Sequence, residues 1–367
     1  MNNSIGEQGQ VTVELLFWNK AYQYIYTANL TLEKLANSPA LSSSVKMRLT
    51  GEALFIRAFC YFYLVNLFGD VPLVTLPDYR INEKYDRTAA SKVYDQIIKD
   101  LGDAADKLPT VYENEERVHP TKWAAVALLA RVHLYLGNWP DAESYSGLVI
   151  QSGLHSLTAS PSEVFLKNGS EAIWQLLPVN PAINTWEGNF ILPATADAPP
   201  TYIFDTSIVS KIEPGDLRGA NWFTRRDYLG QVIYYPTKYL VRGINVPLTE
   251  YYMVLRLAEQ YLIRAEAKVQ QNKIAESLED INVIRHRGGL SDVVASTKDD
   301  VLAAIEKERR VELAAEWGHR WFDLKRTHRA DAVLAPIKSG WQATDVLWPI
   351  PANQIKVNPR LEQNPGY

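Results

Sequence analysis

The sequence of 367 residues predicts an all-α protein whose helices pair into a superhelix, interrupted by one long irregular insertion with short β pieces. Apolar residues recur at helical spacing in three regions, residues 11–68, 91–152 and 251–326. Nine prolines fall within residues 154–249, and prolines at this density prevent long helices. With 47% hydrophobic and 22% charged residues, the chain has enough apolar surface to bury a core.

The first region, residues 11–68, is expected to form two helices. Ser38 and Pro39 separate them, because proline cannot continue a helix. Gly69 favours a C-terminal cap, and Pro72 follows it closely. The second helix is therefore expected to end near Gly69.

The second region predicts a helix, a short turn at Gly137 and Asn138, and a second helix. The small residues Ala130 and Ala142 are placed as in tetratricopeptide helix pairs, in which small side chains let two antiparallel helices pack closely. The third region predicts three further helices. Pairs of this kind, repeated along a chain, indicate a tetratricopeptide-like superhelix, although a strict period of about 34 residues is not kept here.

The insertion combines its prolines with many aromatic residues, in a chain that holds 10 Trp, 20 Tyr and 10 Phe. Short β pieces are expected around residues 172–177 and 231–235. A loop region of this length inside a compact domain is usually functional when it is not disordered, and its aromatic content disfavours disorder. We therefore expect the ligand to bind within residues 154–249.

A single domain is expected over residues 1–367. Its helical body comprises about residues 11–153 and 250–330, and the loop-rich ligand-binding insertion comprises about residues 154–249. Residues 331–367 are expected to wrap along the surface of the body. Their final stretch is rich in Pro and Asn, so no helix is expected there.

Charge and cysteine content exclude several classes of function. The chain has 38 Lys+Arg against 42 Asp+Glu, a net charge of −4, which argues against nucleic acid as a partner because its binding needs a clustered basic surface. The single cysteine, Cys60, excludes an intrachain disulfide and a cysteine-rich zinc site. The six histidines show no metal-ligand spacing, so we expect neither a metal nor a cofactor.

Membrane and targeting patterns are not evident in the sequence. The start, MNNSIGEQGQ, lacks the basic and apolar parts of a signal peptide. The most apolar run, residues 58–65, is far shorter than the roughly 20 residues that a membrane-spanning helix needs. Taken alone, these features indicate a cytoplasmic protein, an interpretation that the family resemblance below reverses.

The densest charge cluster lies in residues 305–326, where Glu308, Glu312 and Glu316 fall four apart on one helical face. Two of these carboxylates could serve as the acid and base of a glycoside hydrolase on a helical scaffold. Several arginines adjoin them, and a nearby cation lowers a carboxyl pKa and disfavours a general acid. No HExxH, GxSxG or Walker A motif is present. We therefore favour a structural ion-pair network and expect no catalytic residue.

An ordered set of segments covers most of the chain outside the insertion. They are Trp18…Tyr22…Ile25…Asn29, GEALFIRAFCYFYLVNLFGDVPLV (51–74), WAAVALLARVHLYLGNW (123–139), LRLAEQYLIRAEA (255–267), INVIRHRGGL (281–290), IEKERRVELAAEWGHRWFDLKR (305–326) and PIPANQIKVNPRLEQNPGY (349–367). By these segments the chain resembles the SusD/RagB family of nutrient-binding outer-membrane lipoproteins.

The resemblance implies a tetratricopeptide-like body and a non-enzymatic role at the cell surface. Such proteins are held on the outer membrane by a lipid on an N-terminal cysteine, and they deliver oligosaccharides or other nutrients to a SusC-like TonB-dependent transporter. A signal peptide and a lipid-accepting cysteine are not present in this sequence, so we expect them to precede it in the full-length protein. An alternative function is a tetratricopeptide-type scaffold that binds peptides on a concave helical face.

If the ligand is a glycan, aromatic rings are expected to stack on the apolar faces of sugar rings, with polar side chains bonding the hydroxyls. The candidate stacking residues in the insertion are Trp186, Tyr202, Trp222 and Tyr228, and the candidate polar partners are Asn184 and Arg225. The alternative for each is a packing role within the insertion, which has added weight for Trp222 because the preceding Asp216-Leu217-Arg218 run resembles a framework element of the family.

Overall fold

The computed structural model describes residues 7–82, 85–180 and 182–367, which form two compact units. The first unit comprises the chain up to Pro109 together with Trp321–Tyr367, and the second comprises Thr110–Arg320. The first six residues and Pro181 of the insertion lie outside the described residues. The predicted insertion falls wholly within the second unit, because it packs against the helices on either side of it in the sequence.

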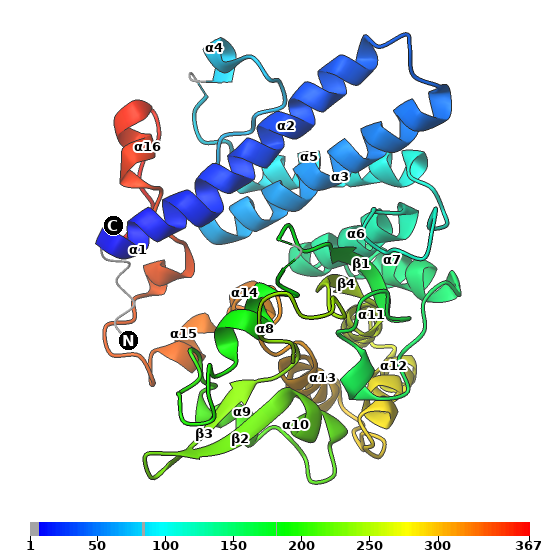
Figure 1. Ribbon diagram of the computed structural model, residues 1–367, viewed down its shortest axis with the longest axis vertical. Helices are drawn as coiled ribbons and strands as arrows, with labels where there is room; N and C mark the ends of the chain where they lie inside the picture. The colour runs from blue at the N-terminus through cyan, green and yellow to red at the C-terminus, as the bar shows by residue number, and fades with distance from the viewer. Residues whose placement is uncertain (1–6, 83–84, 181) are drawn as a thin grey trace. The chain divides into compact units, whose positions relative to one another are not determined.

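The first unit is built of helices (Figure 1). They are α1 (Glu7–Val13), the π-helix η1 (Glu14–Trp18), α2 (Asn19–Ala36), α3 (Ser43–Phe68), α4 (Tyr79–Asn82), α5 (Ala90–Lys107), α15 (Ala330–Leu334), the 3₁₀-helix η3 (Ala343–Val346) and α16 (Ala352–Val357). Helix α14 (His319–Arg326) contains the boundary between the two units in the sequence. The predicted break at Ser38 and Pro39 is confirmed, since it lies between α2 and α3. Gly69, with φ 73°, ends α3 as expected.

Helix α3 forms the core of the first unit, packed between α2 and α5 (Figure 1). It is apolar almost all round because it is covered on more than one face. Length and composition alone would let it cross a membrane, but 78% of its most apolar stretch is buried inside the protein, as in an ordinary core helix. Arg57 on α3 forms a buried pair with Asp100 on α5, with Nε–Oδ2 and NH2–Oδ1 distances of 2.7 Å.

The C-terminal segment runs along the end of α3. The backbone N–H of Trp348 donates to the Leu67 carbonyl at 2.7 Å, and the Asn364 side-chain amide donates to the Phe68 carbonyl at 2.9 Å. The prediction that this segment contains no helix is wrong. Helix α16 begins immediately after Pro351, which is compatible with a helix start because the first helical turn needs no donor there.

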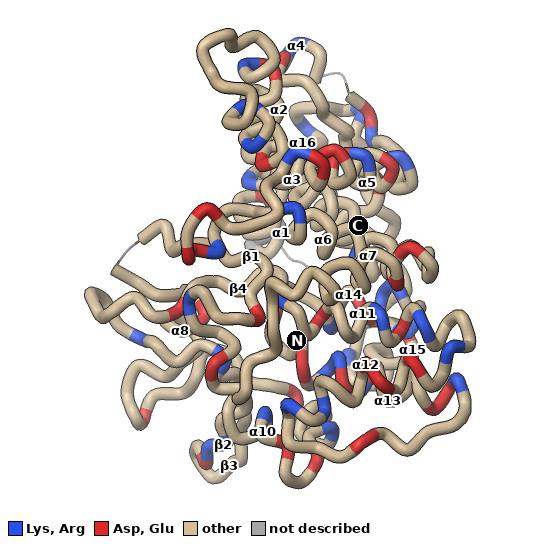
Figure 2. Tube along the Cα trace, turned by 90° about the vertical axis from the view of Figure 1, so that its right-hand side faces the viewer, with Lys and Arg blue, Asp and Glu red and all other residues tan. Residues whose placement is uncertain are grey.

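The second unit combines paired helices with two small sheets. The helices are α6 (Lys122–Leu136), α7 (Trp139–Gln151), α8 (Trp186–Ile191), α9 (Thr206–Val209), α10 (Leu217–Trp222), α11 (Leu257–Gln270), α12 (Ile274–Arg287) and α13 (Lys298–Glu312), with the 3₁₀-helix η2 (Pro161–Glu163). The strands are β1 (Ala172–Leu176), β2 (Phe223–Tyr228), β3 (Gln231–Pro236) and β4 (Tyr252–Arg256). Acidic and basic residues are interspersed along α12 and α13 (Figure 2).

The predicted helix pair is confirmed as α6 and α7, joined at Gly137 with φ 70°. Ala130 and Ala142 are fully buried in one cluster with Ile263 and Ala267 of α11, so the small residues allow three helices to approach closely. Helix α11 in turn packs against α12 and α13 (Figure 1). The predicted all-α, tetratricopeptide-like class is therefore confirmed.

The insertion is more ordered than the prolines indicated. Both predicted β pieces are present, as β1, which pairs antiparallel with β4, and as β3, which pairs antiparallel with β2. Strand β2 and the short helices α8 to α10 were not predicted. The β2–β3 turn consists of Leu229 and Gly230, which both have positive φ (49° and 79°), as a type I′ hairpin turn requires.

Candidate ligand-binding surface

Helix α8 presents two large aromatic rings to solvent. The Thr185 side chain accepts a hydrogen bond from the Gly188 N–H at 3.0 Å and so caps the start of the helix. Trp186 and Phe190 lie one turn apart, 52% and 53% exposed, with ring centroids 5.1 Å apart and planes tilted by 46°. The Trp186 N–H also donates to the Tyr252 hydroxyl at 2.8 Å, which fixes the helix to β4. Two exposed rings on a fixed helix form a ready stacking platform.

Tyr202 lies in the segment that links α8 to the hairpin. Its neighbour Thr201 donates to the Phe190 carbonyl, and the Phe204 N–H donates to the Tyr234 carbonyl at 2.7 Å along the free edge of β3. Tyr202 itself is 63% exposed. This segment therefore holds a third exposed aromatic side chain next to α8.

The hairpin separates two of the predicted residues onto opposite faces. Side chains alternate along β2, so Arg225 and Asp227 share one face, and Arg226 and Tyr228 share the other. Arg225 pairs with Asp227 on the exposed face at 2.8 Å. The Arg226 guanidinium lies 5.4 Å from the Tyr228 ring centre and donates to the Ala198 carbonyl at 2.6 Å, in the loop that leads to Tyr202. The structure thus links Tyr228, but not Arg225, to that loop.

Asn184 is buried rather than available to a ligand. It is 1% exposed, and its carbonyl oxygen accepts the N–H groups of Thr249 and Glu250 at 2.7 and 2.9 Å. Its amide donates to the Pro247 carbonyl at 3.0 Å. Asn184 therefore ties the chain just before α8 to residues 247–250, and it has no free polar group left to offer a ligand.

Trp222 is also a core residue, at 1% exposure. Its indole N–H donates to the Pro161 carbonyl at 2.9 Å, and its ring packs edge-on against Phe165. The Lys238 ammonium lies 4.4 Å from the Trp222 ring centre. No face of the ring is left for a sugar. Trp222 is therefore a packing residue beneath the surface, and its prediction as a ligand contact is corrected.

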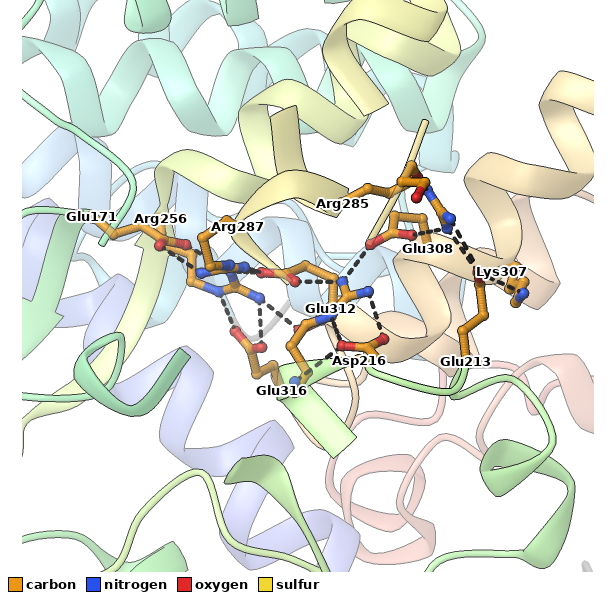
Figure 3. A network of polar contacts seen from close by, with 12 residues as sticks. Glu171, Glu213, Asp216, Arg256, Arg285, Arg287, Lys307, Glu308, Glu312 and Glu316 are labelled. Carbon is orange, nitrogen blue, oxygen red and sulfur yellow. Dashed lines mark hydrogen bonds and ion pairs between the residues drawn. The ribbon is translucent and has the colours of Figure 1, made fainter. Parts of the chain in front are cut away.

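A buried ion-pair network lies in the second unit and involves all three glutamates of the predicted cluster (Figure 3). Glu312 is 0% exposed and accepts from Arg256 at 2.6 Å, from Arg218 at 2.9 Å and from Arg287. Burial disfavours its charged form, but these guanidinium groups outweigh burial and hold the Glu312 pKa well below its usual range. Arg256 also pairs with Glu171 at 2.8 Å.

The neighbouring glutamates of α13 and the turn after it are equally engaged. Glu308 is bonded to Arg218, and Glu316 is bonded to Arg256 at 2.8 Å and to Lys238. The predicted structural role of this cluster is confirmed, because its carboxylates are buried against cations. They do not face an open cleft, so the glycoside-hydrolase interpretation of these three residues is wrong.

The network also anchors the hairpin. Lys238 lies two residues beyond β3, and its ammonium donates to the Glu312 carbonyl at 2.7 Å. Burial lowers the pKa of Lys238 to about 8, although Glu316 opposes that shift. Arg218 of α10 pairs with Asp216 at 2.9 Å. Segments of the insertion are thereby attached through charged groups to α13.

An acid-sensitive contribution to stability is expected from Glu316. Burial opposes its charged form, but Arg256 and Lys238 prevail and lower its pKa to about 2, against about 4.3 for an unfolded glutamate. A depressed folded pKa gives stability that is complete above about pH 5 and is lost as the pH falls toward 2. We expect urea midpoints to fall between pH 5 and pH 3 in the wild type.

The matched comparison is Glu316→Gln, which removes the titrating group. Its urea midpoint should change less over the same interval than that of the wild type. Glu308 acts in the opposite direction, because burial raises its pKa, and it is present in both proteins. Equal pH dependence of the two proteins would contradict the role assigned to Glu316.

The described part of the chain holds neither a reactive thiol nor a metal site. Cys60 is buried, and burial raises its pKa to about 12, so it is not a reactive thiolate. Across residues 7–82, 85–180 and 182–367, no group of three or more His, Cys, Asp or Glu is arranged to hold a metal ion.

Two family models match the chain. One, described as starch-binding associating with outer membrane, matches residues 2–134, and the other, described as the SusD family, matches residues 231–367. The chain belongs to the SusD/RagB family. This is a family of outer-membrane, cell-surface proteins. All six candidate residues lie between the two matched ranges, so the SusD family models assign none of them a role.

Curated relatives and solved structures agree with this SusD assignment. The chain is 28% identical to SusD-like protein P38 of Formosa agariphila over 100% of this chain and 82% of the relative, and 26% identical to SusD-like protein P25 of the same organism over 95% and 79%. A laminarin-binding SusD-like protein aligns with a TM-score of 0.82 and 28% identity over 96% of this chain and 85% of the other. A SusD superfamily protein from Parabacteroides distasonis aligns with a TM-score of 0.84 and 25% identity over the same shares.

Trp186 and Tyr202 were predicted as candidates and both are exposed, whereas Phe190, which lies beside Trp186, was not predicted. The signal was present: Thr185 is a good N-cap, and two aromatics four residues apart lie on one face of any helix that starts there. The prolines on both sides made the whole stretch look irregular. Glu187, Lys238 and Tyr239, which line a pocket next to α8, carried no sequence pattern of their own.

Proposed function

We propose that this SusD-family chain is a non-enzymatic cell-surface protein that binds an oligosaccharide and delivers it to a SusC-like TonB-dependent transporter. The observation that carries the proposal is the exposed pair of Trp186 and Phe190 on α8. Burying a large exposed aromatic ring against a ligand is energetically favourable. The C–H faces of sugar rings offer a flat apolar surface of matching size. Attachment to the outer membrane through an N-terminal lipid is part of the same proposal.

Three features support a binding site at this place. Tyr202 adds a third exposed ring next to α8, and Tyr228 lies on the hairpin face that contacts the same loop. The carboxylates of Glu308, Glu312 and Glu316 are already paired with buried arginines and are therefore not free to act as catalysts. A solved relative of similar fold is named as laminarin-binding. Calorimetry with laminarihexaose and maltohexaose tests the proposal, and release of reducing ends during incubation would overturn the non-enzymatic role.

Trp186→Ala is expected to weaken the binding of the hexasaccharide at least tenfold. Truncating a central Trp at a binding surface commonly costs about 2 kcal/mol or more, and about 1.4 kcal/mol is tenfold in affinity. The folded structure should survive, because half of the side chain is already exposed. Isothermal titration calorimetry measures the effect.

The matched control is Tyr24→Ala on α2, which removes an exposed aromatic (54%) from the other unit. It should bind the hexasaccharide like the wild type. If Trp186→Ala and Tyr24→Ala both retain full affinity for a hexasaccharide that the wild type binds, the binding surface lies elsewhere.

A further inference from the structure

The loop between α8 and α9 (residues 192–205) carries Tyr202, which is 63% exposed. The structure describes this whole loop, and the loop forms neither a helix nor a strand. Thr201 donates to the Phe190 carbonyl, so Tyr202 lies next to α8. Fixing the backbone of an irregular segment costs conformational entropy, and contacts with the rest of the protein must compensate for that cost.

Both ends of the α8–α9 loop are fastened to neighbouring structure. At its start, the Arg242 guanidinium donates to the Leu192 carbonyl at 2.5 Å. At its end, the Phe204 N–H donates to the Tyr234 carbonyl of β3 at 2.7 Å. These bonds fix the two ends and leave the middle of the loop, residues 193–200, to other contacts.

The middle of the loop is held by Arg226 of β2. Its Nη1 atom donates to the Ala198 carbonyl at 2.6 Å, and its Nη2 atom donates to the Ala196 carbonyl. A guanidinium is planar and carries its donors on separate nitrogens in a fixed fork, so one side chain can hold two carbonyls at a set spacing. A lysine, with a single nitrogen on a flexible chain, does not impose that spacing.

Arg226 is itself held in place by the hairpin. It lies within β2, where it pairs with Ile233 of β3 in a ladder that includes every residue from Phe223 to Tyr228. Its guanidinium carbon lies over the Tyr228 ring, 5.4 Å from the ring centre and within the range of a cation–π contact. Arg226 is therefore a rigid support for the loop.

The contacts of Arg226 favour an indirect role over direct contact with a ligand. Both of its terminal nitrogens already donate to loop carbonyls, and the side chain is half-buried. Its neighbour Arg225 lies on the opposite face of the hairpin, where its side chain is 53% exposed and pairs with Asp227. The two arginines have the same chemistry and adjacent positions, but Arg226 contacts the loop and Arg225 faces away from it.

We propose that Arg226 is a positioning residue for sugar binding, which bridges Ala196 and Ala198 so that Tyr202 is held next to α8 before the ligand arrives. The proposal rests on the proposed function and adds to it the means by which the third exposed ring is preorganised. A ring that is already in place does not have to be ordered on binding, and the entropy saved appears as affinity. Without Arg226, the bound sugar has to order the loop itself.

Arg226→Ala is expected to weaken hexasaccharide binding about five- to tenfold, the affinity equivalent of ordering a side chain and its loop during binding. Isothermal titration calorimetry measures the change with whichever of laminarihexaose and maltohexaose the wild type binds. Arg226→Lys, which keeps a donor but not the fork, should recover part of the loss. Arg225→Ala is the matched control and should bind like the wild type.

A double-mutant cycle with Tyr202→Ala distinguishes positioning from a general structural role. Tyr202→Ala alone should weaken binding, and Arg226→Ala should add nothing in that background, because no ring remains to be positioned. A loss of the same size in both backgrounds would show that Arg226 acts through something other than Tyr202, and it would overturn the proposal. Full affinity of either single variant would overturn it too.

Hydrogen exchange at short labelling times follows the loop without a ligand. The Ala198 N–H, which donates to the Thr195 carbonyl at 3.2 Å, should exchange faster in Arg226→Ala than in the wild type or in Arg225→Ala. Equal exchange in all three proteins contradicts the proposal. If the wild type binds neither hexasaccharide, the proposed function fails and the positioning role fails with it. If the wild type and Arg226→Ala bind equally well, the positioning role fails and the proposed function stands.

Discussion

Replacing Glu312 with Gln is expected to lower the unfolding free energy of the second unit by about 3–5 kcal/mol, the usual cost of removing one partner from a buried ion pair. Three guanidinium groups, those of Arg218, Arg256 and Arg287, converge on the Glu312 carboxylate, which is fully buried. The amide of Gln has the shape of the carboxylate but no charge. The substitution therefore takes one charged partner away from three buried guanidinium groups, which keep only their bonds to the remaining carboxylates of the network, such as Glu171 and Glu316.

Urea unfolding followed by circular dichroism measures this loss, and hydrogen exchange of α13 assigns it to the second unit. The control is Glu306→Gln on the same helix, whose partly exposed carboxylate pairs with Arg320 at 3.1 Å. An exposed pair of this kind contributes at most about 1 kcal/mol. If both variants lose the same small amount, the network is not a determinant of stability.

Asp100→Ala is expected to destabilise the first unit by a similar amount, about 3–5 kcal/mol. Asp100 is fully buried and binds Arg57 through both oxygens at 2.7 Å, while Gln96 donates to it at 2.7 Å. Without the carboxylate, the buried guanidinium keeps, among the residues that the structure describes, its hydrogen bond to Asn29 at 2.8 Å. Hydrogen exchange in α3 and α5 should accelerate, because Arg57 and Asp100 join these two helices.

The chain offers a matched control one turn away on α5. Asp103 pairs with Lys99 at 2.7 Å on the exposed side of the helix, so Asp103→Ala should cost about 0.5 kcal/mol or less. The double variant Arg57→Met/Asp100→Leu should recover most of the stability, since apolar side chains of similar size often replace a buried pair without loss. A double variant as unstable as Asp100→Ala would show that the pair is required for more than charge balance.

Helical features were predictable because their determinants are local. The turn at Gly137 and the small residues of α6 and α7 are visible within a short window of sequence. The role of Glu308, Glu312 and Glu316 was predictable because their spacing and the arginines beside them already favoured ion pairs. The identity of those partners was not, since Arg218 lies about 90 residues before Glu308 in the chain.

The candidate site was predicted only in part. Trp186 and Trp222 are both aromatics in a proline-rich stretch, yet one is half exposed and the other is buried. The difference depends on Pro161 and Phe165, which cover Trp222 and lie about 60 residues earlier. The one local difference is the Asp216-Leu217-Arg218 run shortly before Trp222, which resembles a framework element of the family. Asn184 likewise looked like a polar rim residue, and its burial depends on residues 247–250.

The clamp at Asn184 has a consequence for how this protein can diversify. The Asn184 amide fastens the chain just before α8 to residues 247–250, and the Trp186 backbone N–H fastens the start of the helix to Tyr252, so α8 is held at its N-terminal end. Because the attachment lies at the N-terminal end of α8, the exposed side chains of this helix do not contribute to holding it in place. Under the proposed function, exposed residues such as Trp186 and Phe190 can be exchanged for others with a different ligand preference while the attachment stays the same.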